Sequence, residues 1–263
     1  WSLTKLELSD DALLGGRLRL RQPRVGYRVA IDPVLLAAAV DARPGERILD
    51  AGAGTAAAAL CLAERCPEVN VAGLERDPDL VRIGRINLAE NPAGARVELQ
   101  EGNLLARPYL GAPFDQVMTN PPYVRRGCGT APASATAAAA AVAEVPLVDW
   151  LTACLVRLRP HGWLTVIHRG DALPELLAAL DGRVGDLQLF PLWPSAGAPH
   201  ARRVIVAGRK AARGPCRLRR GMVLHEPGGR FTAAAQAVLR GAAGLNLAAA
   251  PDLMGGTCDA ELA

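Results

Sequence analysis

From Glu46 onward, short apolar segments alternate with segments of helical character. This alternation is typical of a parallel β-sheet that carries helices on both faces, so the predicted fold class is α/β. We expect strands at residues 47–51, 70–74, 96–100, 114–119, 163–168, 185–190 and 203–207, and helices at residues 55–65, 77–91, 146–158, 174–180 and 233–240.

The last two predicted strands are joined by a Pro- and Gly-rich stretch without a clear crossover helix, which favours an antiparallel hairpin at the edge of the sheet. The predicted architecture is a Rossmann-like, seven-stranded, mostly parallel sheet that includes this hairpin. We expect three regions: a basic lead-in at residues 1–45 that packs on the core, the sheet domain at residues 46–210, and a C-terminal extension at residues 211–263 with a mobile tail.

The composition is that of a soluble enzyme kept in a reducing compartment. Half of the 263 residues are hydrophobic and 21% are charged, and no stretch is apolar and long enough to be a membrane span. The six cysteines form no CxxC pair and have no histidine at ligand spacing, so we expect reduced thiols, no metal site and a cytoplasmic protein.

Basic residues are gathered in two clusters, although the net charge is only +4. Either cluster could meet the phosphates of a nucleic acid. Abundant Arg and Ala are also typical of a GC-rich genome, so charge alone leaves nucleic-acid contact open. The early cluster is Arg17, Arg19, Arg21, Arg24 and Arg28, and the late cluster is Arg202, Arg203, Arg209, Lys210, Arg213, Arg217, Arg219 and Arg220.

A Gly-rich turn, Asp-Ala-Gly-Ala-Gly-Thr at residues 50–55, follows the first strand and opens a helix. Gly52 and Gly54 let the backbone pass close to a ligand, and the helix amides behind them favour negative charge. Glu75 ends the second strand, where its carboxylate can accept both ribose hydroxyls of an adenosine-containing cofactor. This pattern admits NAD as well as a methyl donor. Asn103, beyond the third strand, can reach an adenine amino group or simply form a turn.

Asn-Pro-Pro-Tyr at residues 120–123 ends the fourth strand. The two prolines fix φ and remove two backbone donors, so a stiff turn presents its carbonyls outward. A planar NH2 group can donate one hydrogen to the Asn120 side chain and the other to the Pro121 carbonyl, while Tyr123 stacks on the planar group. A Pro-rich turn with an incidental tyrosine is the structural alternative. Hydride transfer has no use for this motif, which therefore favours methyl transfer to nitrogen over a dehydrogenase.

These features resemble the class I amino-methyltransferases that carry [DNS]-Pro-Pro-[YFW], and within them the bacterial tRNA(valine) adenine-N6 methyltransferase group. The resemblance covers roughly residues 5–210. It begins with a lead-in in which Gln22 precedes a Gly-rich turn and an Asp-x-x-Leu-Leu run, and it continues through residues 50–55, 73–77 and 120–123. A seven-stranded sheet with an antiparallel hairpin is the fold of that class.

The resemblance implies S-adenosyl-L-methionine as the cofactor and S-adenosylhomocysteine as its product. The cofactor would be held by Asp50, Ala51, Gly52, Gly54, Glu75, Arg76, Asn103, Leu104 and Asn120. The catalytic residues holding the target amine would be Asn120, Pro121, Pro122 and Tyr123, and the RNA contacts would be Arg17, Arg19, Arg21 and Arg28. Two departures stand out: Ala56 and Ala57 replace small glycines, and the Ala-rich segment 124–143 lacks the Arg or His that relatives place there.

The predicted function is methylation of the exocyclic amine of adenine in RNA, with tRNA as the favoured partner. A protein glutamine N5-methyltransferase and an rRNA guanine-N2 methyltransferase are alternatives, because both offer the same NH2 geometry. The glutamine enzymes usually carry a separate helical substrate domain, for which 45 basic residues are too short. A nucleotide-binding regulatory module without turnover is the non-enzymatic alternative.

Overall fold

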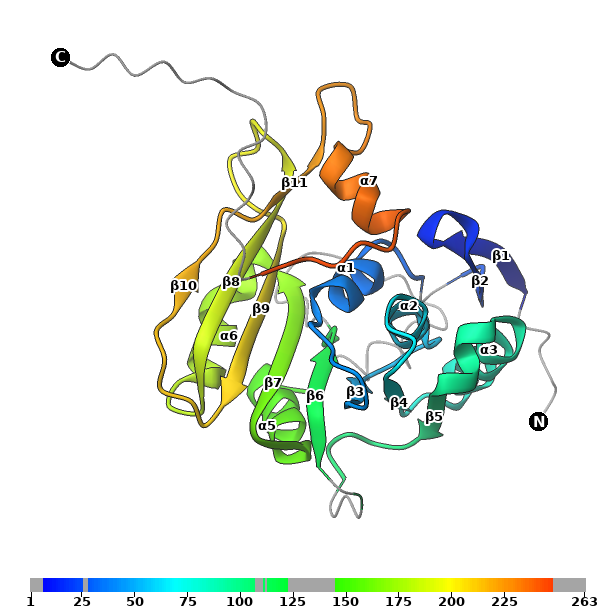
Figure 1. The fold of residues 1–263 in the computed structure, drawn as a ribbon, viewed down its shortest axis with the longest axis horizontal. Coiled ribbons are helices and arrows are strands. Elements are labelled where there is room, and N and C mark those ends of the chain that lie inside the picture. Colours follow the sequence, from blue (N-terminus) through cyan, green and yellow to red (C-terminus); the bar gives the residue numbers. More distant parts are fainter. Residues whose placement is uncertain (1–6, 26–27, 107–110, 112, 123–144, 248–263) are drawn as a thin grey trace, which may run out of the picture.

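The computed structural model describes residues 7–25, 28–106, 111, 113–122 and 145–247. Its main element is a nine-stranded sheet in the order β10-β8-β9-β7-β6-β3-β4-β5, with β11 paired to β8 (Figure 1). All seven predicted strands are present, and they are β3 (Arg47–Ala51), β4 (Asn70–Glu75), β5 (Val97–Glu101), β6 (Phe114–Thr119), β7 (Leu158–Arg169), β8 (Val184–Ser195) and β9 (Arg203–Lys210).

The strand directions confirm the predicted α/β fold. Strands β3 to β7 are parallel, while β9 lies between β7 and β8 and is antiparallel to both. The predicted hairpin is therefore β8–β9. Two short strands that the sequence analysis missed, β10 (Arg217–Leu218) and β11 (Met222–His225), pair in parallel with β8 and form the outer edge.

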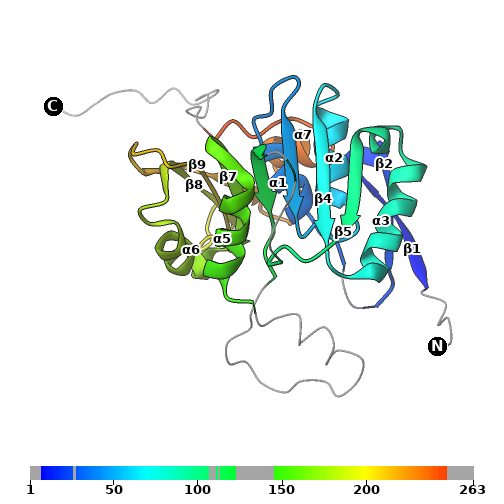
Figure 2. The same ribbon diagram turned by 90° about the horizontal axis from the view of Figure 1, so that it is seen from below.

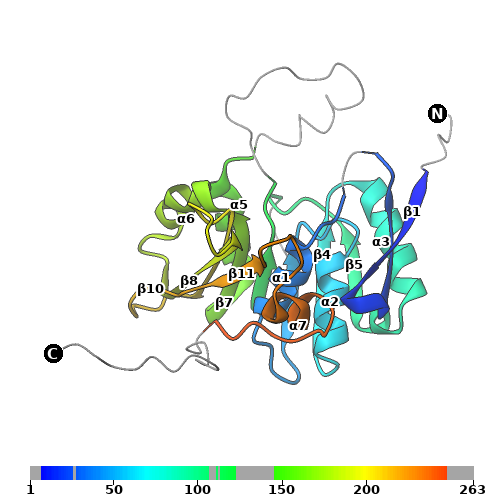
Figure 3. The same cartoon turned by 90° about the horizontal axis from the view of Figure 1, so that it is seen from above.

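Helices cover both faces of the sheet and enclose two hydrophobic cores. One core takes side chains from α1 (Asp32–Ala39), α2 (Ala57–Arg65), α3 (Pro78–Glu90) and α7 (Ala233–Leu239). The other takes them from α5 (Leu147–Arg157) and α6 (Leu173–Leu180). Figures 2 and 3 view the molecule from opposite sides, so that α7 lies behind the sheet in Figure 2 and in front of it in Figure 3. The 3-10 turns are η1 (Leu14–Gly16), η2 (Pro92–Arg96) and η4 (Gly170–Ala172).

Helix α1 lies within the region predicted as a lead-in, where no helix was expected. Its sequence is apolar all round, and Leu35 and Leu36 are completely buried. A helix buried on all sides shows no amphipathic period, so its pattern gives no helical signal. Helix α2 starts at Ala57 rather than at residue 55, because Ala56 adopts a left-handed conformation with φ +63°.

The remainder of the lead-in forms a hairpin of β1 (Leu8–Leu13) and β2 (Leu18–Pro23) beside α3. Asn87 of α3 and its C-cap residue Asn91 each accept from and donate to the backbone of one β2 residue, Arg21 and Arg19 respectively. Four helical residues rise about 6 Å, close to the rise of two strand residues, so the two asparagines pair with the strand as a neighbouring strand would. Asn87 also donates to Thr55 O at 3.0 Å, which links the hairpin to the Gly-rich turn.

The C-terminal extension packs on the same face as α1. The predicted helix at residues 233–240 is confirmed as α7, whose Thr232 N-cap side chain accepts from Ala235 N. After it, Leu245 N donates to Ala38 O in α1 at 2.6 Å. Residues 248–263, in which most of the predicted mobile tail falls, lie outside the described residues.

Candidate active site

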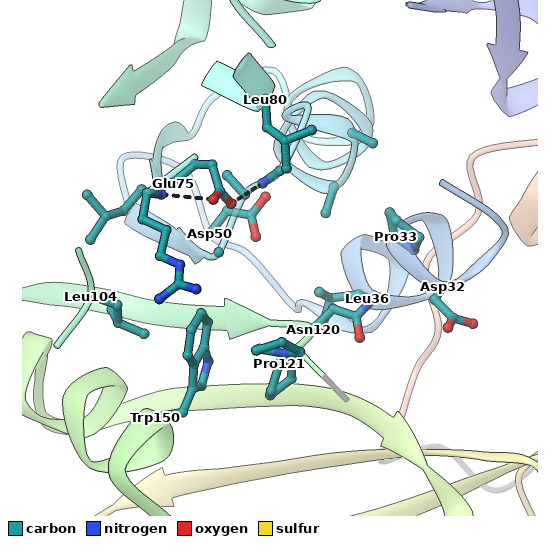
Figure 4. A pocket seen from close by; sticks show the side chains of 18 of the residues that line it. Asp32, Pro33, Leu36, Asp50, Glu75, Leu80, Leu104, Asn120, Pro121 and Trp150 are labelled. Carbon is teal, nitrogen blue, oxygen red and sulfur yellow. Dashed lines mark hydrogen bonds between the residues drawn. The ribbon is translucent and has the colours of Figure 1, made fainter. Parts of the chain in front are cut away.

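A cavity of about 450 Å³ opens at the carboxyl ends of β3, β4, β5 and β6 (Figure 4). Strand β3 pairs with β4 on one side and with β6 on the other, so the chain reverses its winding direction there. Ligands of open α/β sheets bind in the crevice at such a switch point. The wall includes the described cofactor candidates Asp50, Gly52, Gly54, Glu75, Arg76, Asn103, Leu104 and Asn120, whereas Ala51 is buried beside it.

The Gly-rich turn needs its glycines for two reasons. Gly52 and Gly54 have φ of +78° and +55°, a region that L side chains rarely adopt. A Cβ on Gly52 would lie only 2.8 Å from Cζ2 of Trp150. The amides of Gly52 and Ala53 donate to Leu74 O at 2.9 and 3.1 Å, which fixes the turn against β4.

Glu75 also ties the turn to β4. Its Oε2 accepts from Gly54 N at 2.9 Å, and its Oε1 accepts from Arg76 N at 2.8 Å and Asp77 N at 2.9 Å. Two carboxylate oxygens provide about four acceptor positions, so three amide bonds leave capacity for a ligand hydroxyl. Arg76 is exposed at the rim.

Asp50 lies at the base of the cavity and is 2% exposed. Burial raises its pKa to about 7, the amide of Ala59 lowers it, and the charge of Glu75 raises it again. Asp50 Oδ2 accepts from Ala59 N at 3.2 Å, within the first turn of α2. The carboxyl group is therefore balanced between its neutral and charged forms near neutral pH.

Asn103 and Leu104 form the wall beyond β5. Asn103 Oδ1 accepts from Leu105 N at 2.9 Å, and Ala106 N donates to Asn103 O at 3.0 Å. Asn103 therefore forms a turn, the second of its two predicted roles, and it also lines the cavity. Leu104 is buried and supplies an apolar surface.

Asn120, Pro121 and Pro122 follow β6 and line the same cavity. In Figure 4, Asn120 and Pro121 lie across the cavity from Glu75. The structure thus brings the Gly-rich turn and the Asn-Pro-Pro motif together. Tyr123 and the segment 124–143 lie outside the described residues, so the proposed stacking role of Tyr123 stays a prediction.

Trp150 of α5 is a cavity residue that the sequence analysis missed. Its Nε1 donates to Thr119 Oγ1 at 2.9 Å, and Thr119 Oγ1 donates to Ala51 O at 2.7 Å. The indole stands between Leu104 and Pro121 in Figure 4. This chain of contacts joins the Gly-rich turn to the strand end that carries Asn120. A tryptophan on an amphipathic helix gives no sequence signal that separates a cavity wall from a core position.

The lead-in supplies two further charged cavity residues, Asp32, which was not predicted, and Arg28, which was predicted as an RNA contact. Asp32, at the start of α1, forms an ion pair of 2.9 Å with Arg203 of β9, and both line the cavity. Arg28 also lines it and pairs with Asp11 at 3.3 Å. Buried Gln22 accepts from Val29 N and donates to Asp11, which fixes the segment leading into α1.

The other three predicted RNA contacts lie away from the cavity, on the β1–β2 hairpin. Arg17 and Arg19 are exposed, and Arg17 donates to Gly241 O at 3.4 Å. Arg21 pairs with Glu90 at 3.1 Å and with Asp10 at 3.5 Å.

The described residues contain no group of three or more His, Cys, Asp and Glu side chains arranged to hold a metal ion. Nor does any helix among them have the length and apolar character needed to cross a membrane.

The methyltransferase small domain family matches residues 28–147 of the chain. The tRNA1(Val) (adenine(37)-N6)-methyltransferase of Bacteroides fragilis is 30% identical over 69% of this chain and 77% of that protein. Proteins of the same name from Porphyromonas gingivalis and Actinobacillus succinogenes are 32% and 34% identical over 61% and 42% of this chain. The chain spans 66% and 48% of the lengths of these two relatives, that is, about half to two thirds.

Solved structures place the fold in the same class. A protein from Agrobacterium tumefaciens, described as a predicted O-methyltransferase, superposes with a TM-score of 0.67 at 27% identity, over 81% of this chain and 98% of that one. A putative class I S-adenosylmethionine-dependent methyltransferase from Listeria monocytogenes has a TM-score of 0.54 at 17% identity, over 76% of this chain and 65% of that one. The chain therefore belongs to the family of class I methyltransferases that includes the tRNA1(Val) (adenine(37)-N6)-methyltransferases.

Proposed function

We propose that the protein is an S-adenosylmethionine-dependent methyltransferase that methylates the exocyclic amine of an adenine in tRNA. The observation that carries the proposal is the meeting of the Asn-Pro-Pro turn with the Gly-rich turn and Glu75 around one cavity. The names of the relatives support adenine N6 as the target atom and tRNA as the substrate.

The cavity residues fit this cofactor. The turn around Gly52 provides a backbone surface without a Cβ, and Glu75 keeps acceptor capacity for the ribose hydroxyls. Leu104 and Trp150 offer apolar surface to the adenine ring, and Asp50 offers a carboxylate to the ammonium group. When bound, the cofactor supplies an electrophilic sulfonium methyl group.

Asn120 and Pro121 would hold the target amine by accepting its two hydrogens. Delocalisation into the ring weakens the lone pair of an exocyclic amine, and two accepted hydrogen bonds make that lone pair more available. The fixed φ of Pro121 and Pro122 keeps both acceptors in place before the amine arrives. Positioning and exclusion of water then supply most of the catalysis, and no metal or covalent intermediate is required.

An amine suits this pair of acceptors better than a hydroxyl group, which has only one hydrogen to donate. The glutamine amide and the guanine amine remain chemical alternatives, because each carries an NH2 group. The described part of the lead-in is a β-hairpin bound to α3, followed by helix α1. The tRNA in the names of the relatives favours a nucleic-acid target over a glutamine side chain.

Arg17, Arg19, Arg21 and Arg28 remain the predicted phosphate contacts of the lead-in. The exposure of Arg17 and Arg19 supports this role. Arg21 and Arg28 already form ion pairs with carboxylates of the protein. A tRNA substrate is consistent with a cytoplasmic protein.

The test is an incubation of the protein with methyl-labelled cofactor and separate tRNA, rRNA and protein fractions. We expect label in the tRNA fraction, released on digestion as N6-methyladenosine. Label in rRNA as N2-methylguanosine, or in protein as N5-methylglutamine, would replace the proposed substrate. Binding of S-adenosylhomocysteine with no transfer to any fraction would indicate a binding module.

The pKa of Asp50 predicts that affinity for S-adenosylhomocysteine strengthens as the pH rises. A raised carboxyl pKa keeps the proton on the folded protein up to about pH 7, and the ligand ammonium favours the ionised form. Between pH 6 and 8 the dissociation constant should fall by up to about tenfold.

The same pKa shift predicts that the free energy of unfolding declines as the pH rises from 3.8 towards 7, because Asp50 loses its proton in the unfolded chain before it does so in the folded protein.

Calorimetric titration of S-adenosylhomocysteine at several pH values measures this dependence. Asp50→Asn is the control, because an amide of similar shape does not titrate. A pH dependence that survives in Asp50→Asn would assign it to another group.

A further inference from the structure

In the late cluster of basic residues, some side chains have protein partners and others are exposed without an ion pair. Arg203 pairs with Asp32 at 2.9 Å, and Arg209 pairs with Asp186 at 3.7 Å. Lys210 donates to two backbone carbonyls. The exposed side chains for which the described residues provide no ion pair are Arg202, Arg213, Arg217 and Arg220.

Three of these exposed arginines follow the outer edge of the sheet, and we call Arg213, Arg217 and Arg220 the edge row. Arg217 belongs to β10, the outermost strand (Figure 1), and lies opposite Gln188 in the middle of β8. Arg213 lies near the amino end of β8, because the next residue, Gly214, accepts from the Asp186 amide at 3.1 Å. The edge row therefore extends along β8.

The edge row ends close to the cavity. Trp193 Nε1 donates to Arg220 O at 3.0 Å, and Leu192, the residue before Trp193, pairs with Arg203 of β9. Met222 of β11, two residues after Arg220, also pairs with Leu192. Neighbouring strands lie about 4.8 Å apart, so Met222 lies about 10 Å from Arg203, two strand spacings away. Arg203 itself lines the cavity. A line of cationic side chains thus leads from the sheet edge to the rim of the site.

We propose that the edge row binds the phosphate backbone of the RNA and guides the strand that carries the target base to the cavity. This proposal rests on the proposed function and specifies where the substrate lies. Arginines that form no ion pair with the described residues can neutralise phosphates, which releases the counterions condensed on the RNA, the main source of non-specific affinity for nucleic acids. Two of the four predicted contacts in the lead-in, Arg21 and Arg28, pair with carboxylates, whereas none of the three arginines of the edge row has an ion pair among the described residues.

Exposed charges on an edge strand have a second physical role, which is to prevent edge-to-edge pairing of two sheets. The two roles predict different results when the charges are reversed. Loss of a phosphate site weakens RNA binding in a monomeric protein. Loss of edge protection causes self-association and leaves the affinity of the monomer for RNA unchanged.

The test compares the double variant Arg217→Glu with Arg220→Glu against the double variant Arg82→Glu with Arg85→Glu. The control pair is exposed on α3, at the other end of the sheet, and changes the net charge by the same amount. Dissociation constants for tRNA are measured between about 50 and 200 mM salt, a range over which phosphate contacts change the affinity strongly. Binding of S-adenosylhomocysteine and size-exclusion chromatography accompany each variant.

We expect the edge variant to lose about tenfold or more in tRNA affinity, with a logarithmic salt slope reduced by about 1.4–1.8 for two lost contacts. Binding of S-adenosylhomocysteine should be unchanged, and the α3 variant should bind tRNA far better than the edge variant. Arg217→Lys with Arg220→Lys should retain the affinity because it retains the charge. Equal affinities of the two reversal variants, or self-association with normal affinity, would overturn the inference. If the unaltered protein neither binds nor methylates RNA, that result contradicts the proposed function itself, and the edge row with it.

Discussion

Alanine in place of Asn120 is expected to abolish most methyl transfer and leave the binding of S-adenosylhomocysteine within about twofold. The substitution removes one of the two acceptors for the amine, and only the Pro121 carbonyl remains. Loss of one preorganised transition-state contact costs on the order of 2–4 kcal/mol, which is a fall in kcat of roughly 30- to 1,000-fold. Single-turnover transfer to tRNA and calorimetric titration of the product measure the two effects separately.

Asn120→Asp is the matched variant, because a carboxylate still accepts a hydrogen bond at the same distance from the backbone. It should retain substantially more activity than the alanine variant, in line with the aspartate that the resembling motif allows at this position. Near-normal turnover in Asn120→Ala would mean that residues 120–122 form a structural turn and that another group holds the amine.

These expectations depend on residues whose sequence signals were local. Gly52 and Gly54 were identifiable because a turn with positive φ selects glycine, and both have that conformation. Glu75 ends β4 and Asn120 follows β6, and the carboxyl ends of neighbouring parallel strands meet at one edge. Strand pairing therefore brings these separate short motifs together in one site.

The residues that were missed are those whose roles arise from long-range contacts. Asp32 and Arg203 are separated by 171 positions, and neither lies in a motif that identifies the other. Helix α1 was missed because its sequence is apolar all round, and β10, with two residues, is too short to show alternation. The edge row became distinguishable from the rest of the arginines only when the partners of Arg203 and Arg209 were known.

The same reasoning applies to Trp150, whose importance is visible only through its neighbours. Gly52 has a positive φ that favours glycine, and the Trp150 ring would also lie only 2.8 Å from a Cβ at this position. The hydrogen bond to Thr119 holds the indole in place, so the ring cannot move away without loss of that bond. The Gly-rich turn is thus restricted by its own φ and by a wall from α5.

Gly52→Ala is expected to weaken binding of S-adenosylhomocysteine by about tenfold or more and to lower the free energy of unfolding by about 2–5 kcal/mol. The backbone at φ +78° accounts for about 1–2 kcal/mol with any L side chain. The new Cβ, 2.8 Å from Trp150 Cζ2, accounts for the rest, because overpacking costs about 1–3 kcal/mol. Denaturant unfolding and calorimetric titration measure the two quantities.

Gly45→Ala separates the two causes, because Gly45 has φ +79° and no atom within 4 Å of its would-be Cβ. It should lose only the backbone part of the stability and none of the cofactor affinity. Adding Trp150→Phe to Gly52→Ala removes the outer ring atoms that the new methyl group meets, so the double variant should be more stable than the sum of the single effects by about 1 kcal/mol. If Gly52→Ala behaved like Gly45→Ala in both measurements, Trp150 would not constrain the turn, and the cofactor surface would be set by backbone conformation alone.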